Sequence, residues 1–133
     1  MARRRKSDCP IHFALRIFGD AWSLLVIRDL MFKERGSYTD FLRAEEGIAT
    51  NVLAERLARL EGQGIIVKGA GRYRLTRKGI DLVPVVLEII AWSARYDPDT
   101  AAPRAFVRRL RGDKQGLTAE IRARLEEERR RRS

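Results

Sequence analysis

The stretch from Gly47 to Lys68, GIATNVLAERLARLEGQGIIVK, changes its hydrophobic period part-way along. Leu53, Leu57 and Leu60 fall at positions i, i+4 and i+7, which is the spacing of one buried helix face. Two glycines then interrupt the spacing, and β-branched residues follow. The stretch therefore predicts a helix over about residues 50–61 that is followed at once by a strand.

Two short strands joined by glycines are predicted after this helix. Residues 65–68 (IIVK) and 72–76 (RYRLT) are rich in β-branched and aromatic side chains, and the tripeptide GAG joins them. This pattern predicts a β-hairpin with a tight turn. Upstream, apolar periodicity and capping residues predict a helix that begins at Pro10 and a second helix after Asp20. A short helix is predicted around residues 38–46, and Ser37 or Thr39 can cap it.

Two further helices are predicted beyond the hairpin. Thr76 can cap a long helix over residues 77–96, and Pro84 inside it could introduce a kink. Residues 97–103 (DPDTAAP) predict a loop. A last helix is predicted over residues 117–131.

This order of elements predicts the fold class. Three helices followed by a two-stranded ribbon are typical of a winged helix-turn-helix, so we expect a mainly α protein with a β-hairpin wing and flanking dimerisation helices. We divide the chain into a basic N-terminal arm (1–8), a winged helix-turn-helix domain with a dimerisation helix (9–96), and a loop with a C-terminal helix (97–133). The last part would serve dimerisation and carry a basic tail.

The net charge narrows the classes of partner. The chain of 133 residues carries a formal charge of +10, which is typical of proteins that bind nucleic acid or an anionic membrane surface. The longest apolar run, residues 82–90, is too short to span a bilayer and contains Glu88. The basic start lacks an apolar signal segment, and a single cysteine excludes an intramolecular disulfide. We therefore expect a cytoplasmic protein that binds a polyanion and no membrane.

Three stretches resemble the HxlR-type transcription regulators, winged-helix proteins related to the MarR group. The stretches are CPIHFALRIFGDAWSLLVIRDL, YTDFLRAEEGIATNVLAERLARLEGQGII and YRLTRKGIDLVPVVLEIIAW, which together extend from Cys9 to Trp92. The resemblance implies a homodimeric regulator that binds double-stranded DNA, and the two-fold symmetry of such a dimer predicts an inverted-repeat operator. It also implies that dimer contacts come from the first and C-terminal helices, and that Cys9 occupies the position of a thiol sensor found in some members.

The sequence departs from the family pattern at three places. Ser37 stands where many members have an arginine that contacts phosphate. Ala49 stands where a small hydroxyl residue is common, which leaves Thr50 as the expected cap of the reading helix and as a hydroxyl donor. The wing is short, so Lys68 and Arg72 are its main basic residues.

The helix-turn-helix arrangement directs the polar face of the reading helix into the major groove, with the wing (68–72) on the flanking groove or phosphates. Asn51 is suited to reading adenine, although it could also be a solvated residue at the helix start. Glu55 could accept a hydrogen bond from cytosine or pair with Arg59 at i+4, and Arg56 could reach phosphate or pack its stem against the core. The predicted DNA-binding residues are Ser37, Tyr38, Thr39, Thr50, Asn51, Val52, Glu55, Arg56, Lys68 and Arg72.

The sequence also predicts a dimer interface and a candidate effector site. Apolar positions on the first, fifth and last predicted helices are expected to form the dimer interface: Ile11, Leu15, Phe18, Val83, Leu87, Ile90, Trp92, Leu117, Ile121 and Leu125. Cys9 is a candidate thiol sensor, because a helix N terminus and nearby basic residues favour a reactive thiolate. A lone cysteine is otherwise usually a small apolar residue. A small-molecule or oxidant effector is therefore an open alternative.

No catalytic or metal site is predicted. Cys9 and His12 lie at i, i+3, but two ligands are too few for zinc, and no third group that would complete a nucleophile is evident. We expect no enzyme activity and no cofactor. Two alternatives to the regulator remain at this point: a basic protein that binds nucleic acid without regard to sequence, and a small-molecule binder that has lost its DNA-binding function.

Overall fold

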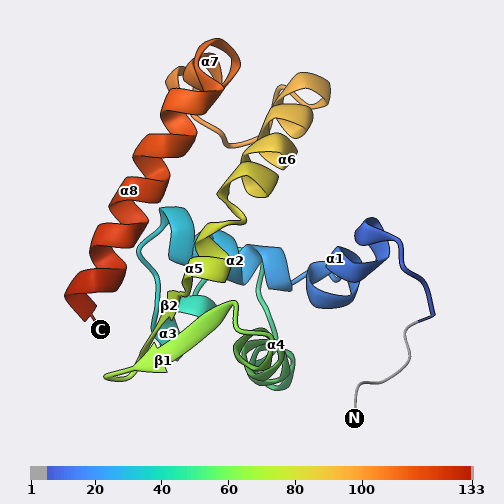
Figure 1. The fold of residues 1–133 in the computed structure, drawn as a ribbon, viewed down its shortest axis with the longest axis vertical. Coiled ribbons are helices and arrows are strands. Elements are labelled where there is room, and N and C mark those ends of the chain that lie inside the picture. The colour runs from blue at the N-terminus through green and yellow to red at the C-terminus, as the bar shows by residue number, and fades with distance from the viewer. Residues whose placement is uncertain (1–5, 133) are drawn as a thin grey trace.

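The computed structural model describes residues 6–132 and confirms the predicted fold class, a mainly helical winged helix-turn-helix (Figure 1). The described residues contain one β-hairpin. The elements in chain order are α1 (Pro10–Phe18), α2 (Ser23–Phe32), α3 (Tyr38–Leu42), α4 (Thr50–Gly62), β1 (Ile66–Gly69), β2 (Arg72–Leu75), α5 (Arg77–Ile80), α6 (Val83–Tyr96), α7 (Arg104–Gly112) and α8 (Lys114–Arg132).

The core lies where α2, α4, the hairpin and α6 meet. Leu53, Leu57 and Leu60 of α4 are buried there, as their spacing predicts. Ile27 and Met31 of α2 are also fully buried. Burying side chains of this size is the main favourable contribution to folding, and it fixes which face of α4 points outward.

The hairpin forms where the sequence predicts it. β1 and β2 pair antiparallel, with Ile66 opposite Leu75 and Gly69 opposite Arg72. The two residues between the strands, Ala70 and Gly71, have φ angles of 52° and 75°. Positive φ at both central positions is the signature of the type I′ turn, whose twist matches that of the strands.

The helix predicted over residues 77–96 is divided in two, so the prediction of one continuous helix is wrong. α5 ends at Ile80, and α6 begins at Val83. Thr76 caps α5 as predicted, because its hydroxyl accepts a hydrogen bond from the Gly79 amide at 3.2 Å. Pro84 lies in the first turn of α6, where its missing N–H is not needed. Proline therefore starts a helix here and does not kink one.

The C-terminal part contains a helix that the sequence did not predict. α7 precedes α8, and α8 begins at Lys114, three residues before the predicted Leu117. In Figure 1, α8 runs from α7 past α6 to the side of the hairpin. Two arginines of α8 bind it to the rest of the chain. Arg124 donates a hydrogen bond to the Met31 carbonyl of α2 at 2.7 Å, and Arg122 pairs with Asp81 at 2.6 Å.

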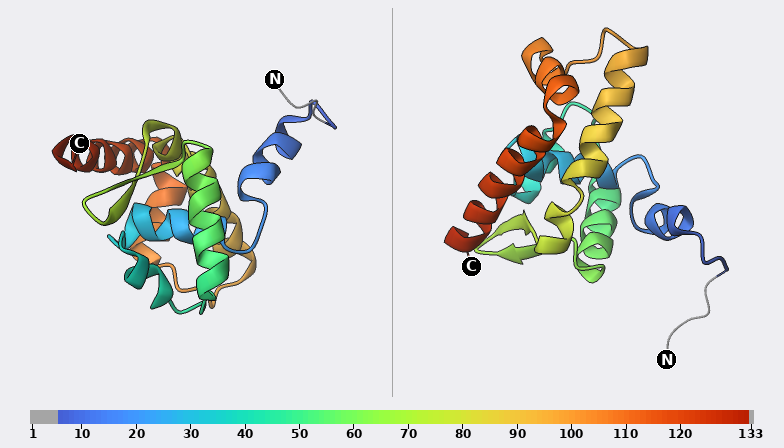
Figure 2. Two further views of the ribbon diagram at one scale, coloured as in Figure 1. Left: turned by 90° about the horizontal axis from the view of Figure 1, so that it is seen from below. Right: turned by 45° about the horizontal axis from the view of Figure 1, so that its top comes forward.

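Helix α1 projects from the rest of the chain (Figures 1 and 2). Ile17 is buried in the core, and Phe18 packs against it. Other apolar side chains of α1 remain exposed. Among the described residues, no single helix is long and apolar enough to cross a membrane, and α1 and α2 satisfy the length and composition only as a pair bent by 79°.

Candidate nucleic-acid interface

Two faces of α4 have opposite character. The face opposite its buried leucines exposes Asn51 and Glu55. Thr50, the first helical residue, is also exposed, and Val52 is half-buried. Five predicted DNA-binding residues, counting half-buried Arg56, therefore lie on the first two turns of one helix, and three of them are exposed. Such a helix can enter a major groove without uncovering the core, because its apolar face is already covered.

The start of α4 differs from the prediction. Ala49 occupies the N-cap position, because its carbonyl accepts the first helical hydrogen bond from Leu53 N at 2.9 Å. Thr50 is thus the first helical residue and does not cap the helix, so that prediction is wrong. No side chain caps α4. The first backbone N–H groups of a helix lack partners within the helix, and they favour a negatively charged group nearby.

A capping box holds α3 next to α4. Ser37 Oγ accepts from Asp40 N at 3.1 Å, and the Asp40 carboxylate accepts from the amides of Ser37 and Gly36, each at 3.1 Å. The Ser37 and Gly36 amides lower the pKa of Asp40. The predicted cap at Ser37 is confirmed, and Thr39 is left exposed.

Tyr38 joins the starts of the two helices. Its hydroxyl donates to the Thr50 carbonyl at 3.0 Å, although the two residues are twelve positions apart. The structure thus brings these two predicted site residues together. The side chain of Tyr38 is also partly open to solvent, so one edge of it lies on the same exposed face.

An ion pair fastens the turn between α3 and α4 to α2. The Arg28 guanidinium donates to both carboxylate oxygens of Glu46, at 2.7 and 3.0 Å, and also pairs with buried Asp29 at 2.8 Å. Its hydrogen bond lowers the pKa of Glu46 to about 2. Sequence reasoning missed this contact, since eighteen residues separate the partners and neither lies in a recognisable motif.

A second group of charges involves α4 itself. Arg56 Nε donates to Asp20 at 3.0 Å, and Arg59 pairs with Glu55 at 3.0 Å. Burial alone would raise the pKa of Asp20, but hydrogen bonds from Ser23, the Trp22 amide and Arg56 hold it well below its ordinary value. This ion pair of Arg56 with Asp20 is neither of its two predicted roles, and its contact with phosphate stays a prediction. Glu55 makes the predicted i, i+4 pair.

The two basic residues of the wing point in different directions. Lys68 is exposed, with its Nζ 5.6 Å from the centre of the Tyr73 ring. Arg72 folds back onto the turn after α2, where it donates to the Glu34 carbonyl at 3.1 Å. Gly36 makes room for it: a Cβ there would lie 2.9 Å from the Tyr73 carbonyl oxygen and 3.2 Å from the Arg72 guanidinium. Lys68 is therefore the freer of the two for a phosphate.

Several predicted dimer residues are buried within the single chain. Val83, Leu87, Leu117, Ile121 and Leu125 belong to the hydrophobic core, so none of them offers a surface to a second subunit. Their assignment to an interface is therefore withdrawn. The periodicity correctly indicated buried faces, but α6 and α8 bury them against their own chain.

Other predicted dimer residues are exposed. Ile11 and Leu15 of α1 are 68% and 55% exposed, and Trp92 is 67% exposed, whereas Phe18 and Ile90 are half-buried. Sequence reasoning missed further exposed apolar residues, namely Phe13, Val85, Ile89 and Tyr96. Positions 85, 89, 92 and 96 have the helical spacing of one stripe, which was the available signal.

Cys9 lies at the start of α1 and is exposed. It occupies the N-cap position without a side-chain cap, and its amide donates to Ser7 Oγ at 3.1 Å. Of the basic residues expected to influence the thiol, Arg4 and Arg5 lie outside the described residues, whereas Lys6 lies within them. Within residues 6–132, no group of three or more His, Cys, Asp or Glu side chains is arranged to hold a metal ion.

Residues 17–101 match the HxlR-like helix-turn-helix family. The chain belongs to this family. It is 33% identical over 69 residues to an uncharacterised HTH-type transcriptional regulator of Methanocaldococcus jannaschii, and 34% identical over 86 residues to another from Synechocystis. The matches cover 52% and 59% of this chain, and the chain spans 63% of the length of each relative.

Solved structures of transcription regulators share the fold. The candidate transcription factor PA1607 has a TM-score of 0.65 and 34% identity, with 74% of each chain covered. Quinone-bound YodB from B. subtilis has a TM-score of 0.58 and 31% identity over 65% of this chain and 99% of that one. The redox regulator HypR in its reduced form has a TM-score of 0.54 and 26% identity, and the match covers 68% of this chain and 95% of that one. This HxlR-like chain is thus similar to transcription regulators and to redox regulators among them.

Proposed function

We propose that this chain is a homodimeric, sequence-specific DNA-binding transcription regulator. The observation that carries the proposal is the exposed start of α4: Asn51 and Glu55 face solvent on a helix whose opposite face is anchored by buried leucines. The uncapped N terminus of α4 suits a backbone phosphate. Membership of a helix-turn-helix family supports the same function.

The exposed apolar residues of α1 and α6 support a dimer. A stripe of large apolar side chains along a helix usually marks an interaction surface. A dimer with two-fold symmetry would present two copies of α4, which would fit an inverted repeat with half-sites about 10 base pairs apart, or a multiple of that spacing.

The test is binding to the DNA upstream of the protein's own gene. Fluorescence anisotropy in excess random competitor would be followed by footprinting on the same fragment. A regulator should prefer its site over random DNA by ~10³ or more and should protect an inverted repeat. The opposite result would be binding that random competitor abolishes, with no footprint on this fragment or on any selected genomic fragment. That result would favour a protein that binds DNA without regard to sequence, because a net charge of +10 is enough to attract the phosphate backbone.

We also propose that Cys9 makes the regulator responsive to oxidants or quinones. The thiol is exposed on α1, the helix that carries part of the proposed dimer surface. The chain has one cysteine, so a disulfide would join two subunits or capture a small thiol. Cys9→Ser should keep DNA affinity and lose any response to peroxide or quinone, and a serine variant that still responds would refute the sensor role.

A further inference from the structure

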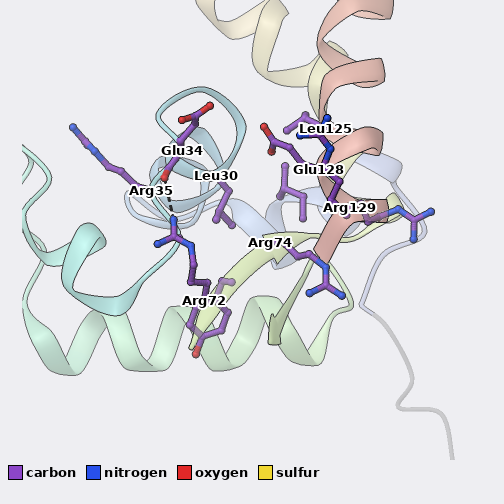
Figure 3. Close-up of a pocket in the computed structure, with 12 residues that line it drawn as sticks. Leu30, Glu34, Arg35, Arg72, Arg74, Leu125, Glu128 and Arg129 are labelled. Carbon is purple, nitrogen blue, oxygen red and sulfur yellow. Dashed lines mark hydrogen bonds between the residues drawn. The ribbon is translucent and has the colours of Figure 1, made fainter. Parts of the chain in front are cut away.

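A pocket lies between the hairpin, the turn after α2 and the last turns of α8 (Figure 3). Its volume is about 240 Å³, and Leu30, Leu75 and Leu125 form its apolar part. α8 lies outside residues 17–101, the part of the chain that matches the family. The pocket is therefore closed by an element that lies outside the matched residues.

Arginine side chains dominate the polar lining. Arg72 and Arg74 come from β2, Arg129 and Arg131 from α8, and Arg35 from the turn after α2. Two carboxylates also line the pocket. One of them, Glu128, pairs with Arg124 at 3.3 Å, and the other belongs to Glu34. Five guanidinium groups against two carboxylates leave an excess of positive charge that favours an anion.

The two arginines of β2 have unsatisfied hydrogen-bonding groups. The Nε atoms of Arg72 and Arg74 are buried and have no hydrogen-bond partner among the described residues. Arg72 still donates through its terminal nitrogen to the Glu34 carbonyl and approaches Asp40 at 3.8 Å. A buried guanidinium N–H without an acceptor is unfavourable, so an oxyanion that supplies acceptors would relieve the cost.

The arginines of α8 are only loosely engaged. Arg129 pairs with Glu126 at 3.1 Å, and Arg131 pairs with Glu127 at 3.2 Å, both along the surface of the same helix. Such pairs on one helix surface are weak and easily exchanged. The guanidinium groups of α8 could therefore turn to a ligand at little cost.

We propose that this pocket binds a small, multiply charged oxyanion, such as a molecule that carries phosphate or several carboxylate groups. Guanidinium forks bind the paired oxygens of both groups well. Figure 3 places Arg74 on the α8 side of β2 and Arg72 on the side of Glu34, so a bound anion would lie between the hairpin and α8. It would join the wing to the C-terminal helix.

A free anion fits this place better than a DNA phosphate. In Figure 1 and in the right view of Figure 2, the hairpin lies between α4 and the C-terminal end of α8. A duplex laid against α4 would therefore meet the hairpin before the pocket. The proposal concerns the free protein, and it can be tested independently of DNA recognition.

The test is calorimetric titration of the full chain with inorganic pyrophosphate and, separately, with citrate. Sodium chloride keeps the ionic strength constant, so that general screening does not change between injections. We expect saturable binding of one anion per chain for at least one of the two. Arg74→Gln should weaken it at least tenfold, whereas Arg108→Gln should leave it unchanged. The control removes the same charge from an exposed position on α7, at the far end of α8 from the hairpin.

Circular dichroism would show that each variant is folded, and Arg129→Gln, on the surface of α8, provides a second variant that should also weaken binding. The proposal is overturned if the wild-type chain binds neither anion saturably, or if all three variants weaken binding equally. It is also overturned if Arg74→Gln reduces DNA affinity and its salt dependence while anion binding is absent. That result would place a DNA phosphate in the pocket.

Discussion

Backbone strain at a single residue limits the stability of the wing. Ala70 has a φ of 52°, a left-handed conformation that costs a residue with a Cβ roughly 1–2 kcal/mol, and asparagine less. Ala70→Asn should therefore raise the free energy of unfolding by about 0.5–1 kcal/mol. Gly71→Ala should have the opposite effect on stability. A Cβ at Gly71 would meet no atom within 4 Å, so the cost would come only from the φ of 75°. We expect it to lose about 1 kcal/mol in urea denaturation, and an unchanged or stabilised Gly71→Ala variant would contradict the turn geometry.

Glu46 makes part of the stability depend on pH. Arg28 lowers its pKa from 4.5 to about 2, so its contribution is fully present above the unfolded pKa of 4.5 and is lost as pH falls through about 2. Glu46→Gln should be less stable than wild type at pH 7 by about 1 kcal/mol, a value reduced because the carboxylate is about one-third exposed.

The difference between Glu46→Gln and wild type should shrink between pH 4.5 and 2 in denaturant titrations. Glu45→Gln, the neighbouring exposed glutamate, is the control and should change stability by less than about 0.5 kcal/mol at every pH. A difference between Glu46→Gln and wild type that stays constant down to pH 2 would show that the ion pair does not titrate as described.

Residue-level features that depend on nearby sequence were predictable, and those that depend on distant partners were not. The caps at Ser37 and Thr76 follow from a hydroxyl three residues before a helical amide. The predicted cap at Thr50 was wrong, because α4 begins at Thr50 itself and Ala49 is its N-cap. The Ala49 carbonyl accepts the first helical hydrogen bond, and no side-chain hydroxyl is needed there. The Arg28–Glu46 pair had no sequence signal because tertiary folding alone brings the two residues together.

At the scale of elements, periodicity predicted that faces are buried but not what covers them. The stripe of Leu117, Ile121 and Leu125 is buried as its spacing requires, yet its partner is the same chain. α7 was missed although Phe106, Val107 and Leu110 mark an apolar face between its four arginines. Pro84 was ambiguous because a proline is compatible with both a kink and a helix start.

The start of α4 and the wing should contribute differently to DNA binding. Asn51→Ala removes a side chain suited to base edges, so affinity for the operator should fall by about 1–3 kcal/mol, while affinity for random DNA and the salt slope stay the same. Lys68→Ala removes a charge on the wing, so binding to both DNAs should weaken and the slope of log K against log salt should fall by ~1.

Both DNA-binding variants can be measured by fluorescence anisotropy at several salt concentrations. α8 begins at Lys114, at the end of this helix away from the hairpin. Lys114→Ala removes the same charge and should leave both quantities unchanged. Equal losses on operator and random DNA for Asn51→Ala would mean that the polar face of α4 does not read bases.

At the scale of the whole molecule, the exposed apolar surface has no partner within the described chain. Val85, Ile89, Trp92 and Tyr96 form a stripe on α6, and the rings of Trp92 and Tyr96 lie 5.3 Å apart. α1 adds further exposed apolar residues. A surface of this kind would be covered by a second copy related by two-fold symmetry, which would also present two α4 helices to an inverted repeat.

A charge placed in this stripe should therefore separate the subunits. Ile89→Asp buries an unpaired carboxylate in a dimer but remains solvated in a monomer, so the dimer dissociation constant should rise at least 100-fold, which is about 3 kcal/mol. Sedimentation equilibrium would measure this change.

Ala105→Asp, at an exposed position of α7, is the control, because it adds the same charge outside the stripe and should not alter the dimer dissociation constant. Ile89→Asp should also weaken protection of the inverted repeat in a footprint, because two linked reading helices bind the repeat more tightly than one. A wild-type chain that sediments as a monomer at micromolar concentration would remove the basis for the proposed operator symmetry, and an Ile89→Asp dimer would place the interface elsewhere on the surface.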